Sequence, residues 1–256
     1  MATRADISER LSALRGELGV QGRRVQSLVE GAFDASFARD EAAAARVVQL
    51  DDEVDRRDVA IERAAVTLLS DLARETVEVD EKDLRWLLTI VKVNNELERI
   101  ADLGVAIAEA AIEAAHAARD EAARGHPASD SGGTSALGSA LRVLANSVIG
   151  ILRDAVSAVE RGDAGLAMLV LRSHHAVDRF RAEVATHIEK RMDGEEAGRP
   201  LGIQRALRLH EMSGRAAMIA DHCTNTAEQV VYVASGMIVR HTEGGWISQG
   251  ADGKGC

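Results

Sequence analysis

Two rows of acidic side chains are the feature of this sequence most suited to chemistry. Glu98 and Asp102 are one helical turn apart, and Glu109 continues their face two turns later. A second acidic row has the same helical spacings and precedes the first, at Asp51, Asp55, Asp58 and Glu62. If the two helices pack antiparallel, carboxylate oxygens from both rows converge, and hard or borderline divalent cations bind such sites. The spacing therefore suggests a site for Fe, Zn, Mn or Mg.

An exposed helix face explains the same spacing without any ligand. Acidic residues three or four positions apart usually belong to a solvated surface with basic neighbours. The basic neighbours here are Arg56, Arg57, Arg63 and Arg99. The residues alone leave both interpretations open.

A related set of side chains occurs in the second half of the chain. It consists of His174, Asp178 and Asp221, and Ala217 stands where the first half has Glu98. A site there would have fewer oxygens and one imidazole, a donor set that suits Zn, Fe or Mn. The same residues are also consistent with a site that has lost ligands, or with histidines that only fill surface or core.

Other catalytic arrangements are absent from the sequence. It has no Gly-x-Gly-x-x-Gly or Walker pattern to hold a phosphate, and no Gly-x-Ser-x-Gly nucleophile turn. Cys223 lies among small residues in a helical pattern, where we expect it to pack, and two cysteines cannot form a disulfide framework. With no nucleophile and no phosphate loop, we expect a protein that acts by binding and is not an enzyme.

Composition restricts the fold class, the partners and the compartment. Aromatic residues make up 2% of the 256 residues and there are two prolines, which disfavours sheets and favours an all-α protein. The formal charge of −10 and the lack of a basic run argue against a nucleic-acid partner. The first residues lack the apolar core of a signal peptide, and apolar stretches such as 230–234 are too short for a membrane span. We therefore expect a cytoplasmic protein without membrane insertion.

Apolar residues recur with a helical period between clear breaks. The pattern predicts six helices, at roughly 4–38, 41–75, 81–123, 135–161, 163–193 and 200–241. Glycine, serine and proline mark a linker between the third and the fourth of these helices, and the last residues of the chain are glycine-rich. The predicted organisation is a first three-helix unit at 1–124, followed by the linker at 125–134. A second three-helix unit follows at 135–241, and a disordered tail at 242–256.

Landmarks of the first unit recur in the same order in the second. Segment 51–55 matches 174–178, and the sequence Ile-Ala-Asp at 100–102 recurs at 219–221. A tandem duplication explains these matches and predicts two three-helix bundles.

The same segments resemble the signature of the PhoU family. The signature covers Leu-Glu-Arg-Ile-Ala-Asp at 97–102 and Ile-Ala-Asp-His-Cys-Thr-Asn-Thr-Ala-Glu at 219–228, and it continues to Val-Arg-His at 239–241. The resemblance extends over nearly the whole chain up to residue 241. It implies two three-helix bundles related by a pseudo-twofold axis.

The resemblance also implies a function and a set of site residues. It implies a cytoplasmic regulator of phosphate uptake and phosphate-starvation signalling, an adaptor between the ATPase of a phosphate ABC transporter and a sensor histidine kinase. Some members bind metal through Glu/Asp-x-x-x-Asp motifs, which by position gives Glu98 and Asp102, opposite Asp51 and Asp55, with Asp221 in the second repeat. The resemblance leaves open a homodimer. The sequence departs from the family pattern at Ala106, Ala217 and Met218.

Two other functions remain open at this point. The carboxylates would also suit a helical bundle that stores or oxidises metal, an enzyme class that needs open coordination positions and redox turnover. A sensor of phosphate or metal that controls a different transporter would have the same helices and the same acidic rows.

Overall fold

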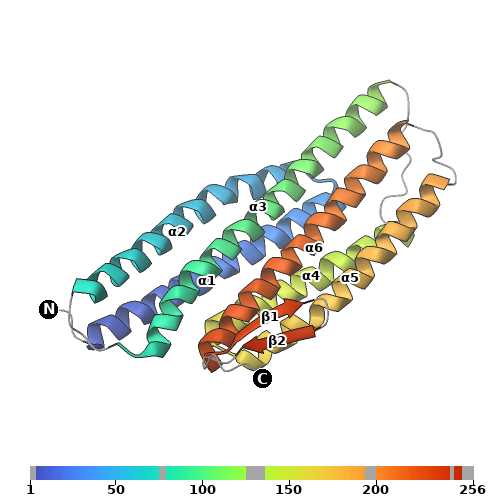
Figure 1. Ribbon diagram of the computed structural model, residues 1–256. Helices are drawn as coiled ribbons and strands as arrows, with labels where there is room; N and C mark the ends of the chain where they lie inside the picture. Colours follow the sequence, from blue (N-terminus) through green and yellow to red (C-terminus); the bar gives the residue numbers. More distant parts are fainter. Residues whose placement is uncertain (1–3, 75–78, 125–135, 194–199, 243–244, 250–256) are drawn as a thin grey trace.

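The computed structural model describes residues 4–74, 79–124, 136–193, 200–242 and 245–249 (Figure 1). Within these residues the helices lie side by side along one long axis (Figure 1). The elements are α1 (Arg4–Ala38), α2 (Glu41–Arg74), α3 (Glu81–Ala123), α4 (Ala136–Arg161), α5 (Ala164–Asp193), α6 (Pro200–Ser235), β1 (Ile238–Thr242) and β2 (Gly245–Gln249). The all-α prediction is confirmed, and the predicted bounds of the first five helices differ from the observed ones by at most one residue.

Helices α1, α2 and α3 form one bundle, and α4, α5 and α6 form the other. Each helix buries an apolar stripe, and in α2 the buried residues include Val47, Val54, Ile61 and Leu68. Helices of this kind are marginal alone in water, so burial of the stripe against two neighbours supplies most of their stability.

The turn between the first two helices has the same construction in both bundles. Arg39 and Gly162 have positive φ values of 56° and 63°. The next residue caps the following helix in each case: Asp40 Oδ1 accepts from an amide of α2 at 2.9 Å, and Asp163 Oδ1 accepts from an amide of α5 at 3.0 Å. The repeat predicted from the sequence is therefore visible in the backbone.

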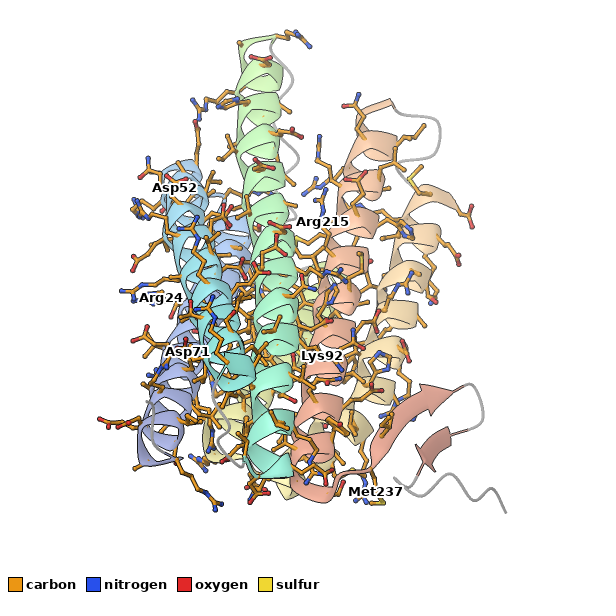
Figure 2. All side chains as sticks on the ribbon, turned by 60° about the vertical axis from the view of Figure 1, so that its left-hand side comes forward. Arg24, Asp52, Asp71, Lys92, Arg215 and Met237 are labelled. Atoms are coloured by element: carbon orange, nitrogen blue, oxygen red, sulfur yellow. The ribbon has the colours of Figure 1, made fainter. Side chains whose placement is uncertain are left out.

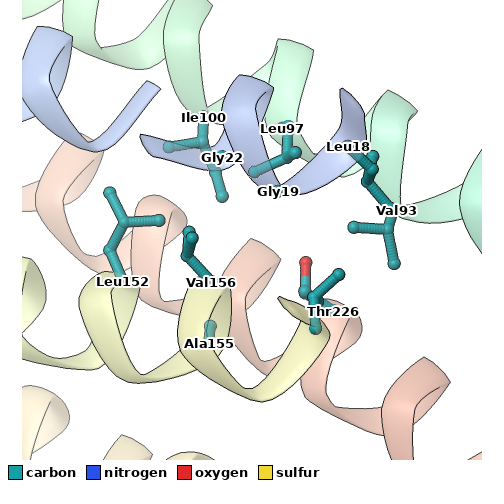
Figure 3. A pocket seen from close by; sticks show the side chains of 11 residues that line it. Leu18, Gly19, Gly22, Val93, Leu97, Ile100, Leu152, Ala155, Val156 and Thr226 are labelled. Atoms are coloured by element: carbon teal, nitrogen blue, oxygen red, sulfur yellow. The ribbon is translucent and has the colours of Figure 1, made fainter. Parts of the chain in front are cut away.

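The bundles meet where α3 packs on α6 and α1 packs on α4, while α2 and α5 lie outside this seam (Figure 1). Glycines allow α1 and α4 to approach closely, since a Cβ on Gly22 would lie 2.9 Å from Val156 Cγ1. An ion pair between Arg23 and Glu160 crosses the same contact. Figure 3 shows a small void where α1, α3, α4 and α6 meet, lined mostly by apolar side chains and by Thr226. The seam is thus a packed core shared by both bundles.

The C-terminal end differs from the prediction. α6 ends at Ser235 and not at 241, because Gly236 has a φ of 71° and its amide donates to Tyr232 O at 2.8 Å, which terminates the helix. Segments 238–242 and 245–249 then pair as an antiparallel hairpin. Residue 242 and residues 245–249 of the predicted disordered tail therefore lie in these strands, and β1, whose Val239 is buried, packs on α6. Residues 250–256 and the predicted linker 125–134 lie outside the described residues.

Two glycine substitutions should have opposite effects on stability. Gly150 lies inside α4 and a Cβ there meets nothing within 4 Å, so Gly150→Ala should raise the free energy of unfolding by about 0.5–1 kcal/mol. Gly22→Ala should lower it, because its Cβ would press on Val156. Urea unfolding of both variants measures the difference, and a stabilised Gly22→Ala would contradict the close packing of α1 on α4.

Candidate metal centre

The two acidic rows face each other across the α2–α3 pair. Asn94 on α3 donates from Nδ2 to Asp58 on α2, at 3.0 Å to the backbone oxygen and 2.6 Å to Oδ1. Further along the same two helices, burial raises the pKa of Asp102 on α3, and Asp55 on α2 is close enough to raise it further. We call the facing carboxylates the carboxylate ladder, which consists of Asp51, Asp55, Asp58, Glu98, Asp102 and Glu109.

Asp51 is the most perturbed carboxyl group of the ladder. Burial raises its pKa to about 6, and repulsion from Asp55 and Asp102 adds to this shift. Its Oδ1 atom is buried and has no hydrogen-bond partner. A buried carboxylate oxygen without a donor is costly, and a cation is one group that would satisfy it.

Glu98 lies in an electrostatic environment similar to that of Asp51. Its pKa is raised by burial and by Asp102, Asp58 and Asp55, while Arg99 opposes the shift. The side chains therefore fit a hard divalent cation, which would relieve the repulsion and pair with Asp51 Oδ1. Among the described residues, however, no three His, Cys, Asp or Glu side chains already converge closely enough to hold a metal ion. Binding would require the side chains of the ladder to move toward one another.

The second bundle brings its three predicted residues together in a different way. His174 Nε2 lies 2.5 Å from Asp221 Oδ1, and His174 Nδ1 lies 3.5 Å from Asp178 Oδ2. The hydrogen bond to Asp221 raises the pKa of His174, burial lowers it, and the charge of Asp178 raises it. Ala217 is buried and offers no ligand. Both imidazole nitrogens therefore already face a carboxylate, and the second site is poorer in free donor atoms than the first.

A third polar group at the seam was not identified from the sequence. Glu96 Oε2 lies 2.7 Å from His222 Nδ1 and accepts from Asn225 Nδ2 at 3.1 Å. Burial raises the pKa of Glu96, but the hydrogen bonds to His222 and Asn225 outweigh burial, so that the pKa lies below its ordinary value. A further hydrogen bond between the bundles runs from Arg215 of α6 to Ala106 O at 3.2 Å, and Figure 2 shows Arg215 beside α3. These pairs could not be predicted from the sequence, because they depend on the antiparallel packing of α3 on α6.

Lowering the pH should stabilise the cation-free protein through Asp51. Its folded pKa of about 6 exceeds the ordinary 3.8, so between these values the folded state holds a proton that the unfolded state has released. This contribution to the free energy of unfolding is present below about pH 4 and is lost as the pH rises through about 6. At pH 7, Asp51→Asn should therefore be more stable than the unsubstituted protein by about 1 kcal/mol, a value reduced for partial solvation. Urea titrations at several pH values test this, with the neighbouring exposed Asp52→Asn as control, which should change stability less.

The fold and the ladder define a class of all-α proteins: two duplicated three-helix bundles with facing acidic motifs. The model of the PhoU domain matches residues 21–111 and 141–230, one match in each bundle. The chain belongs to the PhoU domain family.

Relatives and solved structures match over most of the chain. It is 29% identical to the phosphate-specific transport system accessory protein PhoU homolog of Pseudomonas putida, over 90% of this chain and 81% of that protein. It is 23% identical to PhoU homolog 1 of Thermotoga maritima, over 98% and 100%. The crystal structure of PhoU from Pseudomonas aeruginosa superimposes with a TM-score of 0.76 at 26% identity, covering 90% of this chain and 99% of that one. PhoU from Streptococcus pneumoniae, at 19% identity and a TM-score of 0.75, has the same fold over 92% of this chain and 100% of its own.

Proposed function

We propose that this protein is a PhoU-type accessory protein of a phosphate transport system and that it acts by binding, without turnover. The observation that carries this proposal is the match of the PhoU domain to both bundles, together with relatives that are named as accessory proteins of phosphate-specific transport. The sequence offers no catalytic motif that would favour an enzyme. No helix in the described part of the chain is long and apolar enough to cross a bilayer.

The partners in this proposal are the ATPase of a phosphate ABC transporter and a sensor histidine kinase, contacted in the cytoplasm. Long helices offer wide faces for such contacts, and the charge of −10 suits a basic surface on a partner. In this role the protein reports the state of the transporter to the kinase. A homodimer is compatible with the same surfaces.

The carboxylate ladder is proposed to bind a divalent cation, which would supply positive charge between α2 and α3. Asp51, Asp55, Glu98 and Asp102 would hold it. The buried, unpartnered Oδ1 of Asp51 and the raised pKa of Glu98 support this assignment. The second site, of His174, Asp178 and Asp221, would bind more weakly because the imidazole already lies between the two carboxylates.

Affinity purification of the tagged protein from cells grown in high and in low phosphate tests the partner assignment. We expect the transporter ATPase or the kinase to co-purify, and recovery of neither class would contradict the adaptor role. Elemental analysis of the same preparation, purified without chelator, identifies any bound metal. Oxygen consumption on addition of ferrous iron would instead favour a protein that stores or oxidises metal.

A further inference from the structure

A half-buried polar contact joins the two bundles beside the carboxylate ladder. The Glu96 side chain is 16% exposed and that of His222 is 15% exposed, and they meet at 2.7 Å across the α3–α6 seam. Asn225 donates to the same carboxylate oxygen of Glu96 at 3.1 Å. Because this carboxylate is half-buried, losing its two donors would cost more free energy than breaking a fully exposed pair, and the contact therefore favours one arrangement of α3 against α6.

The position of Glu96 connects this contact to the ladder. Asn94 and Glu98, two residues before and after it on α3, face α2, whereas Glu96 faces α6. On α6, His222 directly follows Asp221, which contacts α5. Polar contacts therefore follow one another across α2, α3, α6 and α5, and they are Asp58–Asn94, Glu96–His222 and Asp221–His174.

We propose that Glu96 ties the carboxylate ladder to the second bundle, so that a cation bound on the ladder and the Glu96–His222 contact stabilise each other. This inference rests on the cation binding proposed above. A cation that draws Glu98 and Asp102 toward α2 fixes the rotation of α3 about its axis. Because α3 is one continuous helix, the same rotation fixes the direction of Glu96 toward α6. Glu96 thus acts as a positioning residue for the ladder and not as a ligand.

The variant His222→Leu separates this coupling from simple electrostatics. It removes the contact with Glu96 and leaves every carboxylate in place. Loss of a neutral or positive imidazole leaves cation binding unchanged, or tightens it, if the effect acts only through space. Coupling predicts the opposite effect of His222→Leu: the affinity for Mn²⁺, measured by calorimetry, should fall by roughly fivefold.

Three further measurements complete the test. His187→Leu, a histidine-to-leucine change on α5 whose ring faces Glu183 of the same helix, should leave Mn²⁺ binding unchanged. Asn225→Ala, which removes the second donor to Glu96 at an exposed position, should weaken binding in the same direction as His222→Leu. Hydrogen exchange of the unsubstituted protein should slow on Mn²⁺ addition in residues 218–226 of α6 as well as in α2 and α3, and His222→Leu should lose only the α6 effect.

The outcomes distinguish this inference from the proposed function. Mn²⁺ binding with exchange protection confined to α2 and α3, or unchanged binding by His222→Leu and Asn225→Ala, would overturn the coupling and leave the cation site intact. No binding of Mn²⁺ or any other divalent cation by the unsubstituted protein would overturn the cation site, and the coupling with it.

Discussion

Replacing Glu98 and Asp102 with alanine should abolish divalent cation binding by the first bundle. Both side chains lie on the α2-facing side of α3, and their pKa values are raised by burial and by the carboxylates around them. Removing two ligands at once should weaken binding by roughly 100-fold or more, since even residues that only orient a metal ligand contribute 10–100-fold. Mn²⁺ titration by calorimetry, with metal content determined by elemental analysis, measures the loss.

The same pair of changes should not damage the fold. Both side chains lie where like charges repel, so the cation-free double variant should be at least as stable as the unsubstituted protein. Asp221→Ala is the matched comparison in the second bundle, where His174 already pairs with Asp221 at 2.5 Å. It should reduce cation binding less. An equal loss from Asp221→Ala would show that the second site binds metal as well as the first.

Most of the fold could be predicted because helices are specified locally. Buried positions such as Val47, Val54 and Ile61 repeat with the helical period, and short polar breaks separate the helices. The acidic rows followed from the same reasoning, since residues one turn apart share a face whatever the helix packs against. That Asp55 and Asp102 face each other required only that consecutive helices pack antiparallel.

The parts that could not be predicted depend on contacts between distant residues. Glu96 and His222 are 126 positions apart, and no local pattern pairs them. The end of α6 depends on the backbone of Gly236, and the hairpin depends on packing of Val239 that composition does not reveal. The second site is similar: the sequence placed His174 near Asp221, but only the packing of α5 on α6 shows that the imidazole lies between two carboxylates.

Aromatic packing in α1 connects the core of the first bundle to the seam. Phe33 is 1% exposed and is the largest fully buried side chain among the described residues. Its ring stacks on Phe37 with centroids 6.3 Å apart, and the guanidinium of Arg142 on α4 lies 4.4 Å from the Phe37 ring. In a chain with only three phenylalanines, most of the core consists of smaller aliphatic side chains that cannot expand to fill a large space.

Phe33→Ala should therefore destabilise the protein by about 3–5 kcal/mol, through lost burial and through the cavity that remains. Phe33→Leu retains most of the volume and should cost about 1 kcal/mol. Because the cavity would open beside the contact of α1 with α4, and both bundles share that seam, urea unfolding of each variant should remain a single transition with a lower midpoint. If Phe33→Ala and Phe33→Leu lowered the free energy of unfolding equally, the neighbouring side chains would have filled the cavity without cost, and the prediction would be wrong. A separate early transition confined to the first bundle would mean that the two halves unfold independently and that the seam contributes little to stability.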